Sequence, residues 1–574
     1  MPRILWALLF VLLPGLPLNA QEPKTTPDNR AHAVYVLEEN AVAILNDEDM
    51  TVRTRVPFTK PPKTTRWMSY WGCFGSLCPP PYYIRWHGHD PETLALIFRG
   101  RLLTIDMDAE TAVGEDELGC DARWAGRNRS GQLAVAICEG NLQEHRPNVL
   151  LSFDARHGKI LQRREVETTS KLFSWVDDQT ILFLYPGTPW EKPAKRKPAR
   201  VEVVDFPSLQ VRTTISLPGS MVYYQWWDEG GLLLVTDPGV NDKNPAKMVP
   251  GKLYIIDPKA AKLTATVELG PGPGPLAWDA ERKAFYFFSI PKKVDAATPA
   301  TVNLFDGTRI TTRFKLEEQP LMIVAAPDHS RMYVLTTGQI HLLNPDLSGE
   351  QGTIPLSDPP SGMVFMDPPT LAYVLHSASS AVSAVDLSGK KVVAKLTTGR
   401  GSVKFWQDVA SVANTRYTAP EANTDALVGP DGKTLYVYND QTKDVTIIDS
   451  ATQAILAKVP GSNGQHQCVP GKKYMVLVYP GLTVIDLNKR AVHAKYPSND
   501  MVFLCPCGEH AYLSNLSNKA YKDQGWVDHD LVRIDFATGK TVTAAGVKGL
   551  PLLPRPGLDQ ISSEPGVVLG GAVE

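Results

Sequence analysis

Short runs of alternating apolar and polar residues, separated by turns, are repeated along this chain. The segment 429–459 shows the pattern most clearly, with apolar runs at 435–437, 445–449 and 455–459 and turns rich in Gly, Asp and Asn between them. Runs this short, with a period near two, predict antiparallel β-strands. Because one such unit cannot bury both of its faces alone, we expect the unit to recur.

An apolar run that ends in Asp or Asn marks each recurrence, and we call these final residues the landmarks. Between positions 46 and 535 the spacing averages about 49 residues. A side-chain oxygen of Asp or Asn can accept hydrogen bonds from the backbone just ahead and so start a turn, which predicts structural rather than catalytic acids. The eleven landmarks are Asn46, Asp106, Asp154, Asp205, Asp257, Asp306, Asn344, Asp386, Asp449, Asp486 and Asp535.

Strand-only repeats of this length predict an all-β fold, a β-propeller built of about eleven four-stranded blades. Eleven blades exceed the roughly four to eight blades of an ordinary ring. Two arrangements stay open: two consecutive propellers, or one ring in which some units are extensions. We favour two propellers, 21–318 with about six repeats and 319–574 with about five, and the long interval from Asp386 to Asp449 is a rival boundary.

The run Leu435-Tyr436-Val437 with the following strand 445–449 resembles the YVTN-type repeat, which is named for its tyrosine-valine motif. Further copies of the tyrosine-valine pair lie at 331–334, 372–374 and 33–36. Repeats of this type are seen in lactonase-like and surface-layer propellers. The resemblance implies a propeller fold and leaves the activity open.

Residues 1–20 have the features of a secretory signal peptide. Arg3 gives a positive start, 4–13 is strongly apolar, and 18–20 ends in alanine. This pattern predicts a periplasmic or secreted protein, with an uncleaved N-terminal anchor as the alternative. No later segment is long and apolar enough to span a bilayer, so no transmembrane segment is expected after signal removal.

Seven cysteines in a secreted chain predict disulfides. Facing residues of an antiparallel hairpin have a constant sum of residue numbers, and Cys120 and Cys138 are centred on the turn at 128–131. These two cysteines are therefore expected to face each other and to form a disulfide.

A second group of cysteines lies in the last repeats. Cys468 and Cys505 occupy equivalent positions of adjacent repeats, so a bridge from Cys468 to Cys505 is predicted, with Cys507 as the other possible partner. A metal site is the competing interpretation, because thiolates and imidazoles are zinc ligands. Its candidate ligands are His466, Cys468, Cys505, Cys507 and His510.

The segment 60–90 interrupts the repeat and is rich in aromatic residues. A Cys73–Cys78 disulfide is predicted to tie its central loop. Rigid aromatic side chains present a large contact area at low entropic cost, which favours a surface for a protein or glycan partner. The alternative is that these rings plug a channel or pack between rings. The candidate contact residues are Trp67, Tyr70, Trp71, Tyr82, Tyr83 and Trp86.

The formal net charge of −2 gives no global field toward nucleic acid, so no nucleic-acid partner is expected. No C-x-x-C-H haem-attachment motif occurs, and no cofactor is expected. The sequence favours an extracytoplasmic propeller scaffold that binds a protein or glycan. The alternative is an enzyme, either a lactonase-like hydrolase or a dehydrogenase-type redox subunit. The sequence names neither a substrate nor a partner.

Overall fold

The computed structural model describes the chain from Ala33 to Pro551 with internal gaps. The gaps are residues 39, 59–81, 87–92, 99–100, 119–121, 129–132, 139–146, 155, 168–170, 188–196, 220, 222, 228, 242–243, 377–378, 400–415, 418–425, 440–443, 461–464, 469–472, 479–481, 497–500, 506, 515–529 and 549.

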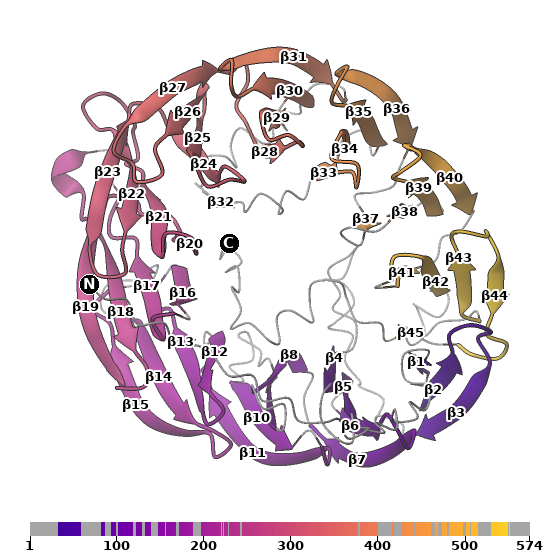
Figure 1. Ribbon diagram of the computed structural model, residues 1–574. Coiled ribbons are helices and arrows are strands. Elements are labelled where there is room, and N and C mark those ends of the chain that lie inside the picture. The colour runs from indigo at the N-terminus through magenta and orange to yellow at the C-terminus, as the bar shows by residue number, and fades with distance from the viewer. Residues whose placement is uncertain are drawn as a thin grey trace, which may run out of the picture.

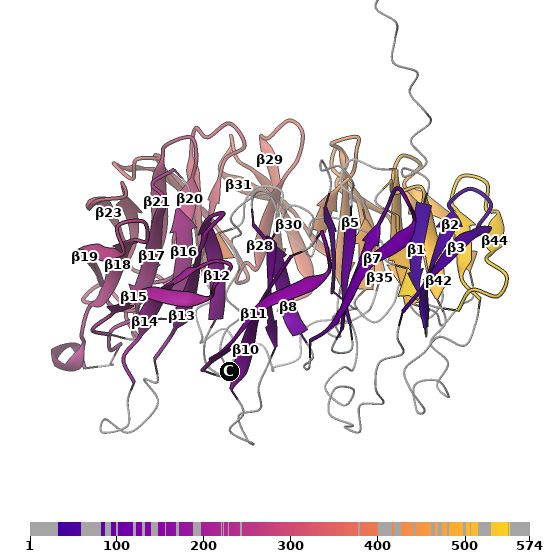
Figure 2. The same ribbon diagram turned by 90° about the horizontal axis from the view of Figure 1, so that it is seen from below.

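Eleven antiparallel sheets follow one another around a single ring, which is a β-propeller of eleven blades (Figure 1). Seen from the side, the strands of each blade run between the two faces of the ring (Figure 2). Blade 1 contains β1 (Ala33–Leu37), β2 (Ala41–Asn46) and β3 (Val52–Pro57), and blade 2 contains β4 (Tyr82–Trp86), β5 (Thr93–Phe98), β6 (Arg101–Asp106) and β7 (Thr111–Glu117). Blade 3 contains β8 (Ala122–Arg127), β9 (Leu133–Cys138), β10 (Asn148–Asp154) and β11 (Lys159–Val166). Blade 4 contains β12 (Lys171–Asp177), β13 (Thr180–Tyr185), β14 (Arg200–Asp205) and β15 (Gln210–Ser216).

The middle blades repeat this order, with a short 3₁₀ helix at Pro245–Lys247 in blade 5. Blades 5 to 8 contain β16 (Tyr223–Trp227), β17 (Leu232–Asp237), β18 (Gly251–Asp257) and β19 (Lys262–Gly270); β20 (Ala277–Asp279), β21 (Ala284–Ser289), β22 (Ala300–Phe305) and β23 (Ile310–Leu316); β24 (Pro320–Ala325), β25 (Met332–Thr336), β26 (Gln339–Leu343) and β27 (Glu350–Pro355), with β32 (Arg416–Tyr417) added in parallel to β24; and β28 (Gly362–Phe365), β29 (Leu371–His376), β30 (Ala381–Asp386) and β31 (Lys391–Thr397).

The last three blades lead back to the first. They contain β33 (Ala426–Val428), β34 (Thr434–Asn439), β35 (Asp444–Asp449) and β36 (Ala454–Pro460); β37 (Gln465–Cys468), β38 (Tyr474–Val478), β39 (Leu482–Asp486) and β40 (Ala491–Tyr496); and β41 (Met501–Leu504), β42 (His510–Ser514), β43 (Val532–Asp535) and β44 (Thr541–Thr543).

The two ends of the described chain meet in blade 1. The strand β45 (Leu550–Pro551) pairs with β1, so that Leu550 lies opposite Leu37 and Pro551 opposite Val36. The C-terminal strand thus becomes the innermost strand of the first blade, and blade 11 becomes the neighbour of blade 1. This pairing closes one ring, whereas the sequence favoured two consecutive propellers.

The core of the ring is a series of buried apolar clusters between neighbouring blades. Eleven clusters are present among the described residues, one for each of the eleven interfaces. Leu316 of blade 6 and Ile323 of blade 7 belong to the same cluster, so the interface near residue 318 is packed like the others. The cluster between blades 11 and 1 joins Tyr512 to Val36. The core is therefore continuous around the ring.

The turn role of the landmarks is visible in their hydrogen bonds. The carboxylate Oδ1 of Asp106 accepts the backbone N–H groups of Asp108 at 2.8 Å and Ala109 at 2.9 Å. Seven other landmarks accept backbone N–H groups two or three residues ahead in the same way, and for these eight residues the structural prediction is confirmed. The seven are Asp154, Asp257, Asp306, Asp386, Asp449, Asp486 and Asp535.

Among the described residues, no helix has both the length and the apolar character that a membrane span requires.

Candidate functional site at the ring closure

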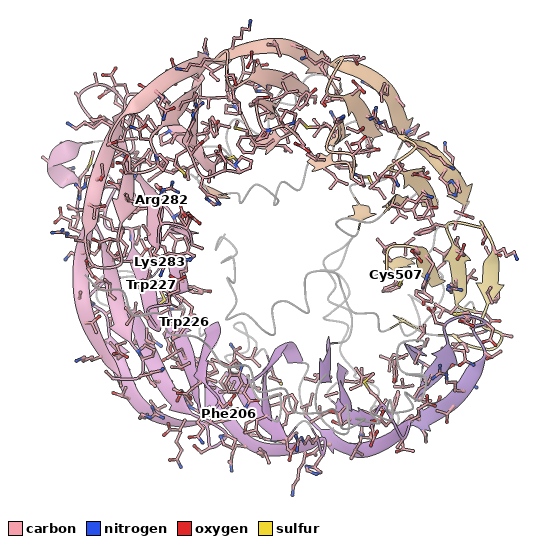
Figure 3. The ribbon with its side chains drawn as sticks, viewed as in Figure 1. Phe206, Trp226, Trp227, Arg282, Lys283 and Cys507 are labelled. Carbon is pink, nitrogen blue, oxygen red and sulfur yellow. A yellow bond between two sulfur atoms is a disulfide. The ribbon has the colours of Figure 1, made fainter. Side chains whose placement is uncertain are left out.

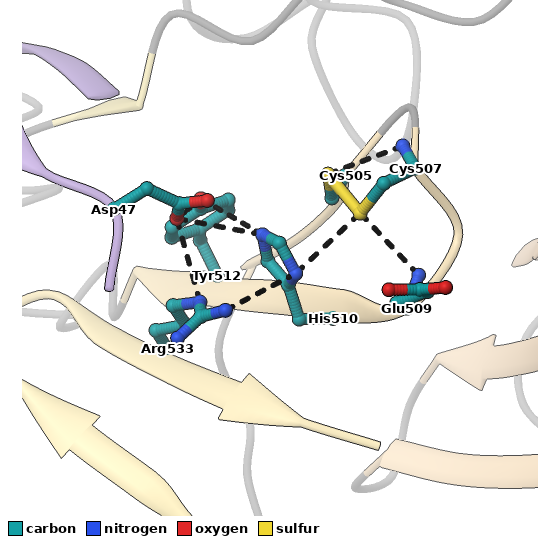
Figure 4. The surroundings of a disulfide bond; sticks show 7 residues. All are labelled: Asp47, Cys505, Cys507, Glu509, His510, Tyr512 and Arg533. Atoms are coloured by element: carbon teal, nitrogen blue, oxygen red, sulfur yellow. Dashed lines mark hydrogen bonds and ion pairs between the residues drawn. A yellow bond between two sulfur atoms is a disulfide. The ribbon is translucent and has the colours of Figure 1, made fainter. Parts of the chain in front are cut away.

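The interface that closes the ring carries a cluster of polar and sulfur-containing side chains, which we call the closing-blade centre (Figure 4). Blade 11 supplies five of its residues and blade 1 supplies the sixth, from the turn after β2. On the whole ring, Cys507 lies at the inner side of blade 11 (Figure 3). The members are Asp47, Cys505, Cys507, His510, Tyr512 and Arg533.

The two cysteines lie in the turn between β41 and β42. The backbone N–H of Cys505 donates to the carbonyl of His510 at 3.0 Å, and the N–H of Gly508 donates to the carbonyl of Cys505 at 2.8 Å. Gly508 has a φ of 71°, a left-handed conformation that glycine adopts without steric cost. This turn brings the Cα atoms of Cys505 and Cys507 within 5.2 Å, and the two residues form a disulfide.

The predicted Cys468–Cys505 bridge is therefore corrected, because Cys505 pairs with Cys507. Cys468 and Cys505 do occupy equivalent places, at the end of β37 and just after β41. The turn between β41 and β42 brings its own two cysteines together, with their Cα atoms 5.2 Å apart.

His510 lies directly beside the disulfide at the start of β42. Its Nδ1 is 3.4 Å from Sγ of Cys507. The two sulfur atoms and one ring nitrogen of His510 lie within 4.8 Å of one another. His510 is buried, with 6% of its surface exposed, while both cysteines are partly exposed. The two cysteines are therefore partly accessible to solvent, whereas the imidazole is shielded.

The neighbours of His510 determine which ring nitrogen carries the hydrogen. A guanidinium only donates hydrogen bonds, and Nη2 of Arg533 lies 3.4 Å from Nδ1 of His510. Nδ1 is therefore the acceptor, and Nε2 carries the hydrogen. Nε2 donates to the hydroxyl of Tyr512 at 3.0 Å, and that hydroxyl donates to Asp47. Nδ1 therefore carries the lone pair, and both Nη2 of Arg533 and Sγ of Cys507 lie 3.4 Å from it.

The carboxylate of Asp47 provides the charge at the far end of this chain. It lies 3.5 Å from Nε2 of His510 and 3.4 Å from Nε of Arg533. Burial raises the pKa of Asp47, but hydrogen bonds from His510 and Tyr512 and the charge of Arg533 outweigh it, so the pKa lies below its ordinary value. Burial, reinforced by the charge of Asp47, raises the pKa of Tyr512. The tyrosine thus stays a neutral donor and Asp47 stays an ionised acceptor.

This arrangement has two chemical capabilities. As a disulfide, Cys505 and Cys507 can accept two electrons through thiol–disulfide exchange. As a dithiol, the same residues with Nδ1 of His510 form a ligand set that suits zinc and other thiophilic cations. The structure thus joins three of the five predicted metal ligands. His466 and Cys468 lie on β37, and their side chains are outside the described part of the structure.

Sequence reasoning missed Asp47, Tyr512 and Arg533, although alignment of the repeats contains a signal for two of them. Asp47 is the only acidic residue that directly follows one of the eleven landmarks. Arg533 is the only charged residue two positions before a landmark. Asp47 and Arg533 thus differ from the apolar or small residues at the equivalent positions of the other repeats. A charged residue at such a position indicates a candidate functional site.

The predicted contact residues fall into two groups. Trp67, Tyr70 and Trp71 lie outside the described residues, as does the predicted Cys73–Cys78 pair. Tyr82, Tyr83 and Trp86 lie on β4, the innermost strand of blade 2. That part of the expected insertion is therefore a regular blade strand.

The predicted Cys120–Cys138 pair is described on one side only. Cys138 is buried at the end of β9 and is disulfide-bonded. Ala122 lies opposite it in the sheet, so the hairpin register differs from the one expected. Cys120 is outside the described residues, and its pairing with Cys138 stays a prediction.

No protein-family model and no curated protein matches this chain. Among solved structures, the chain is similar to hydrazine synthase of Kuenenia stuttgartiensis, with 16% identity over 57% of this chain and 95% of that chain and a TM-score of 0.30. It is also similar to apo AztD of Citrobacter koseri, with 12% identity over 63% and 91% of the two chains and a TM-score of 0.32. It is similar as well to the dihydro-heme d1 dehydrogenase NirN, with 12% identity over 75% of this chain and 73% of that chain and a TM-score of 0.30. At these scores the likeness assigns no function to this chain.

Proposed function

We propose that the protein is an extracytoplasmic, YVTN-type β-propeller scaffold that binds a protein or glycan partner in the central space of the ring. The observation that carries this proposal is the place of β4. It is the innermost strand of its sheet and carries three aromatic residues at the edge that faces the centre (Figure 1). Disulfides persist in oxidising compartments, which supports the extracytoplasmic location.

A second innermost strand of the ring has the same aromatic pattern as β4 and provides the comparison for the test. The innermost strand of blade 5, β16, has the same Tyr-Tyr-x-x-Trp pattern as β4. In β16 the indole of Trp227 packs against Phe285 with ring centroids 5.6 Å apart. Trp86 corresponds to Trp227 in the sequences of the two strands. We assign the partner contact to Tyr82, the first residue of β4, because β4 is the innermost strand of blade 2.

The test compares equivalent tyrosines of the two strands. We expect the Tyr82→Ser variant to lose most of its capture of the co-purifying partner, because the aromatic contact area is removed. The Tyr223→Ser variant changes the same position of β16 and should capture the partner like the unaltered protein. Capture is measured by affinity purification from the native extracytoplasmic fraction, with circular dichroism as the folding check. Equal capture by the two variants would contradict the proposal.

A second candidate function, thiol–disulfide exchange, is favoured by the Cys505–Cys507 disulfide beside His510. A partner dithiol would attack Sγ of Cys507, break the S–S bond and form a mixed disulfide. Its second thiolate would then release the partner as a disulfide and leave Cys505 and Cys507 as two thiols. Alkylation and mass spectrometry after incubation with a dithiol should find both residues alkylated, and unmodified residues would contradict this candidate.

A further inference from the structure

We infer that the reduced closing-blade centre binds one Zn²⁺ ion through Cys505, Cys507 and His510. The three residues leave a fourth position open, as in zinc sites that exchange a ligand. This inference rests on the second candidate function, because the thiolates exist only after the disulfide is reduced. It goes beyond that candidate in naming a cation and its ligands.

The spacing of the ligand atoms fits a tetrahedral ion. With Zn–S near 2.3 Å and Zn–N near 2.0 Å, a sulfur and a nitrogen ligand of one zinc ion lie roughly 3.5 Å apart. Sγ of Cys507 and Nδ1 of His510 are 3.4 Å apart before any metal is considered. Two sulfur ligands lie roughly 3.8 Å apart by the same geometry. The Cα separation of 5.2 Å lets the two thiolates reach that distance once their bond is broken.

The surroundings of His510 point independently to a ligand role. A metal-binding histidine generally donates its second ring N–H to a carboxylate or another acceptor, which fixes the tautomer and the ring orientation. Here Nε2 donates to Tyr512, which donates to Asp47. Nδ1 carries the lone pair and lies 3.4 Å from both Sγ of Cys507 and Nη2 of Arg533, so a bound ion would replace the contact from Arg533. Asp47 comes from blade 1, so the ring closure itself orients the imidazole of blade 11.

The chemistry balances through two linked steps. A dithiol supplies two electrons and two protons to the Cys505–Cys507 bond and becomes a disulfide itself. Zn²⁺ then replaces the two thiol protons and forms two Zn–S bonds, and it takes Nδ1 of His510 as a neutral ligand. The disulfide and the bound cation are therefore alternative states of one site, and oxidation releases the ion.

The experiment uses the full mature chain, with and without reduction by a phosphine. The phosphine reduces the disulfide to two thiols and is itself oxidised to a phosphine oxide, with the oxygen atom supplied by water. Zn²⁺ is titrated against a chromophoric chelator, and thiols are counted on the same sample by alkylation. We expect about one additional Zn²⁺ per chain after reduction and none before it. A Cys468→Ser variant serves as the control and should still bind.

Variants of the centre separate ligands from positioning residues. The Cys505→Ser/Cys507→Ser double variant should lose the ion. Asp47→Asn should bind roughly tenfold more weakly, because the orientation of His510 is lost, and Asp47→Glu should restore much of the affinity. New thiols at Cys505 and Cys507 without bound zinc would overturn the zinc inference alone. If Cys505 and Cys507 stay joined by their disulfide, both thiol exchange and zinc binding are overturned.

Discussion

The interface between blades 9 and 10 and the interface that closes the ring each contain a buried tyrosine at the equivalent position of the repeat. In blade 9 the hydroxyl of Tyr436 donates to the backbone carbonyl of Leu487 at 2.8 Å. In blade 11 the hydroxyl of Tyr512 donates to the carboxylate of Asp47. Leu487 and Asp47 both directly follow a landmark of the neighbouring blade. The same contact thus ends on a neutral group at one interface and on a charge at the other.

The turns beside these tyrosines share a backbone and differ in chemistry. Gly432 and Gly508 have φ values of 66° and 71° and make equivalent hydrogen bonds within their turns. In blade 9 the carboxylate of Asp431 accepts the hydroxyl of Thr434 at 2.8 Å. In blade 11 the corresponding residues are Cys507 and His510. The two turns therefore have the same backbone conformation. The hydrogen-bonded pair of Asp431 and Thr434 in blade 9 is replaced in blade 11 by Cys507 and His510, which are possible metal ligands.

The positive charges are also placed differently at the two interfaces. Arg490 of blade 10 reaches across to Asp431 at 2.7 Å and to Asp449 at 2.8 Å, both in blade 9. At the ring closure, Arg533 comes from blade 11 and contacts Asp47 of blade 1. Arg490 joins two blades through acids at two different turns of blade 9, whereas Arg533 also contacts the imidazole of His510. Only the second arrangement sets a tautomer.

The largest expected effect tests whether the two tyrosines are equivalent as packing. Tyr436 and Tyr512 are each 1% exposed, so truncation to alanine leaves a cavity. Each Tyr→Ala variant should lower the free energy of unfolding by about 3–5 kcal/mol. Chemical denaturation measures the loss, and Val393→Ala, on an exposed outer strand, should change it by less than about 0.5 kcal/mol. A small loss at only one tyrosine would break the equivalence.

A smaller change separates the two hydroxyl contacts. Tyr436→Phe removes a hydrogen bond to a carbonyl and should cost about 1 kcal/mol, whereas Tyr512→Phe removes one to a carboxylate and should cost about 2 kcal/mol. The ring volume is kept in both variants, so packing stays the same. Urea unfolding of the two variants at neutral pH measures the difference. Equal costs would mean that the charge of Asp47 contributes nothing to the contact.

The prediction with the smallest effect concerns acid. Because the pKa of Asp47 is lowered in the folded chain, its ionised form stabilises the fold above the ordinary pKa of 3.8, and this contribution is lost as the pH falls toward the folded value. Asp47→Asn should remove that part of the acid dependence, less than about 1 kcal/mol. Denaturation between pH 7 and pH 3 measures it, with Glu48→Gln at the neighbouring exposed position as the control. An unchanged pH profile in Asp47→Asn would contradict the assignment.

The repeat in the sequence predicted much of the fold, because the residues that form the turns can be recognised within each repeat. Landmarks such as Asp106 could be identified as turn residues from local chemistry alone. The number of rings could not be predicted, since closure depends on β45, two residues long, pairing with β1 across the whole length of the chain. No periodicity is visible in a strand this short.

The site was predicted in part for a similar reason. Cys505, Cys507 and His510 lie within six residues, and their ligand chemistry was evident. Their pairing was assigned wrongly because the comparison of repeats favoured a partner in the next blade over a partner across the same turn. Asp47 comes from the other end of the chain, and only the ring closure places it beside His510.

Peptide mapping of the unreduced protein tests the account most directly, because the oxidised closing-blade centre requires that Cys505 and Cys507 pair with each other. Trypsin releases both cysteines in one peptide, 496–519, and Cys468 in another, 459–472. We expect the peptide 496–519 to be released alone and lighter by two hydrogen atoms than its reduced form. A cross-linked product that joins 459–472 to 496–519 would contradict the account.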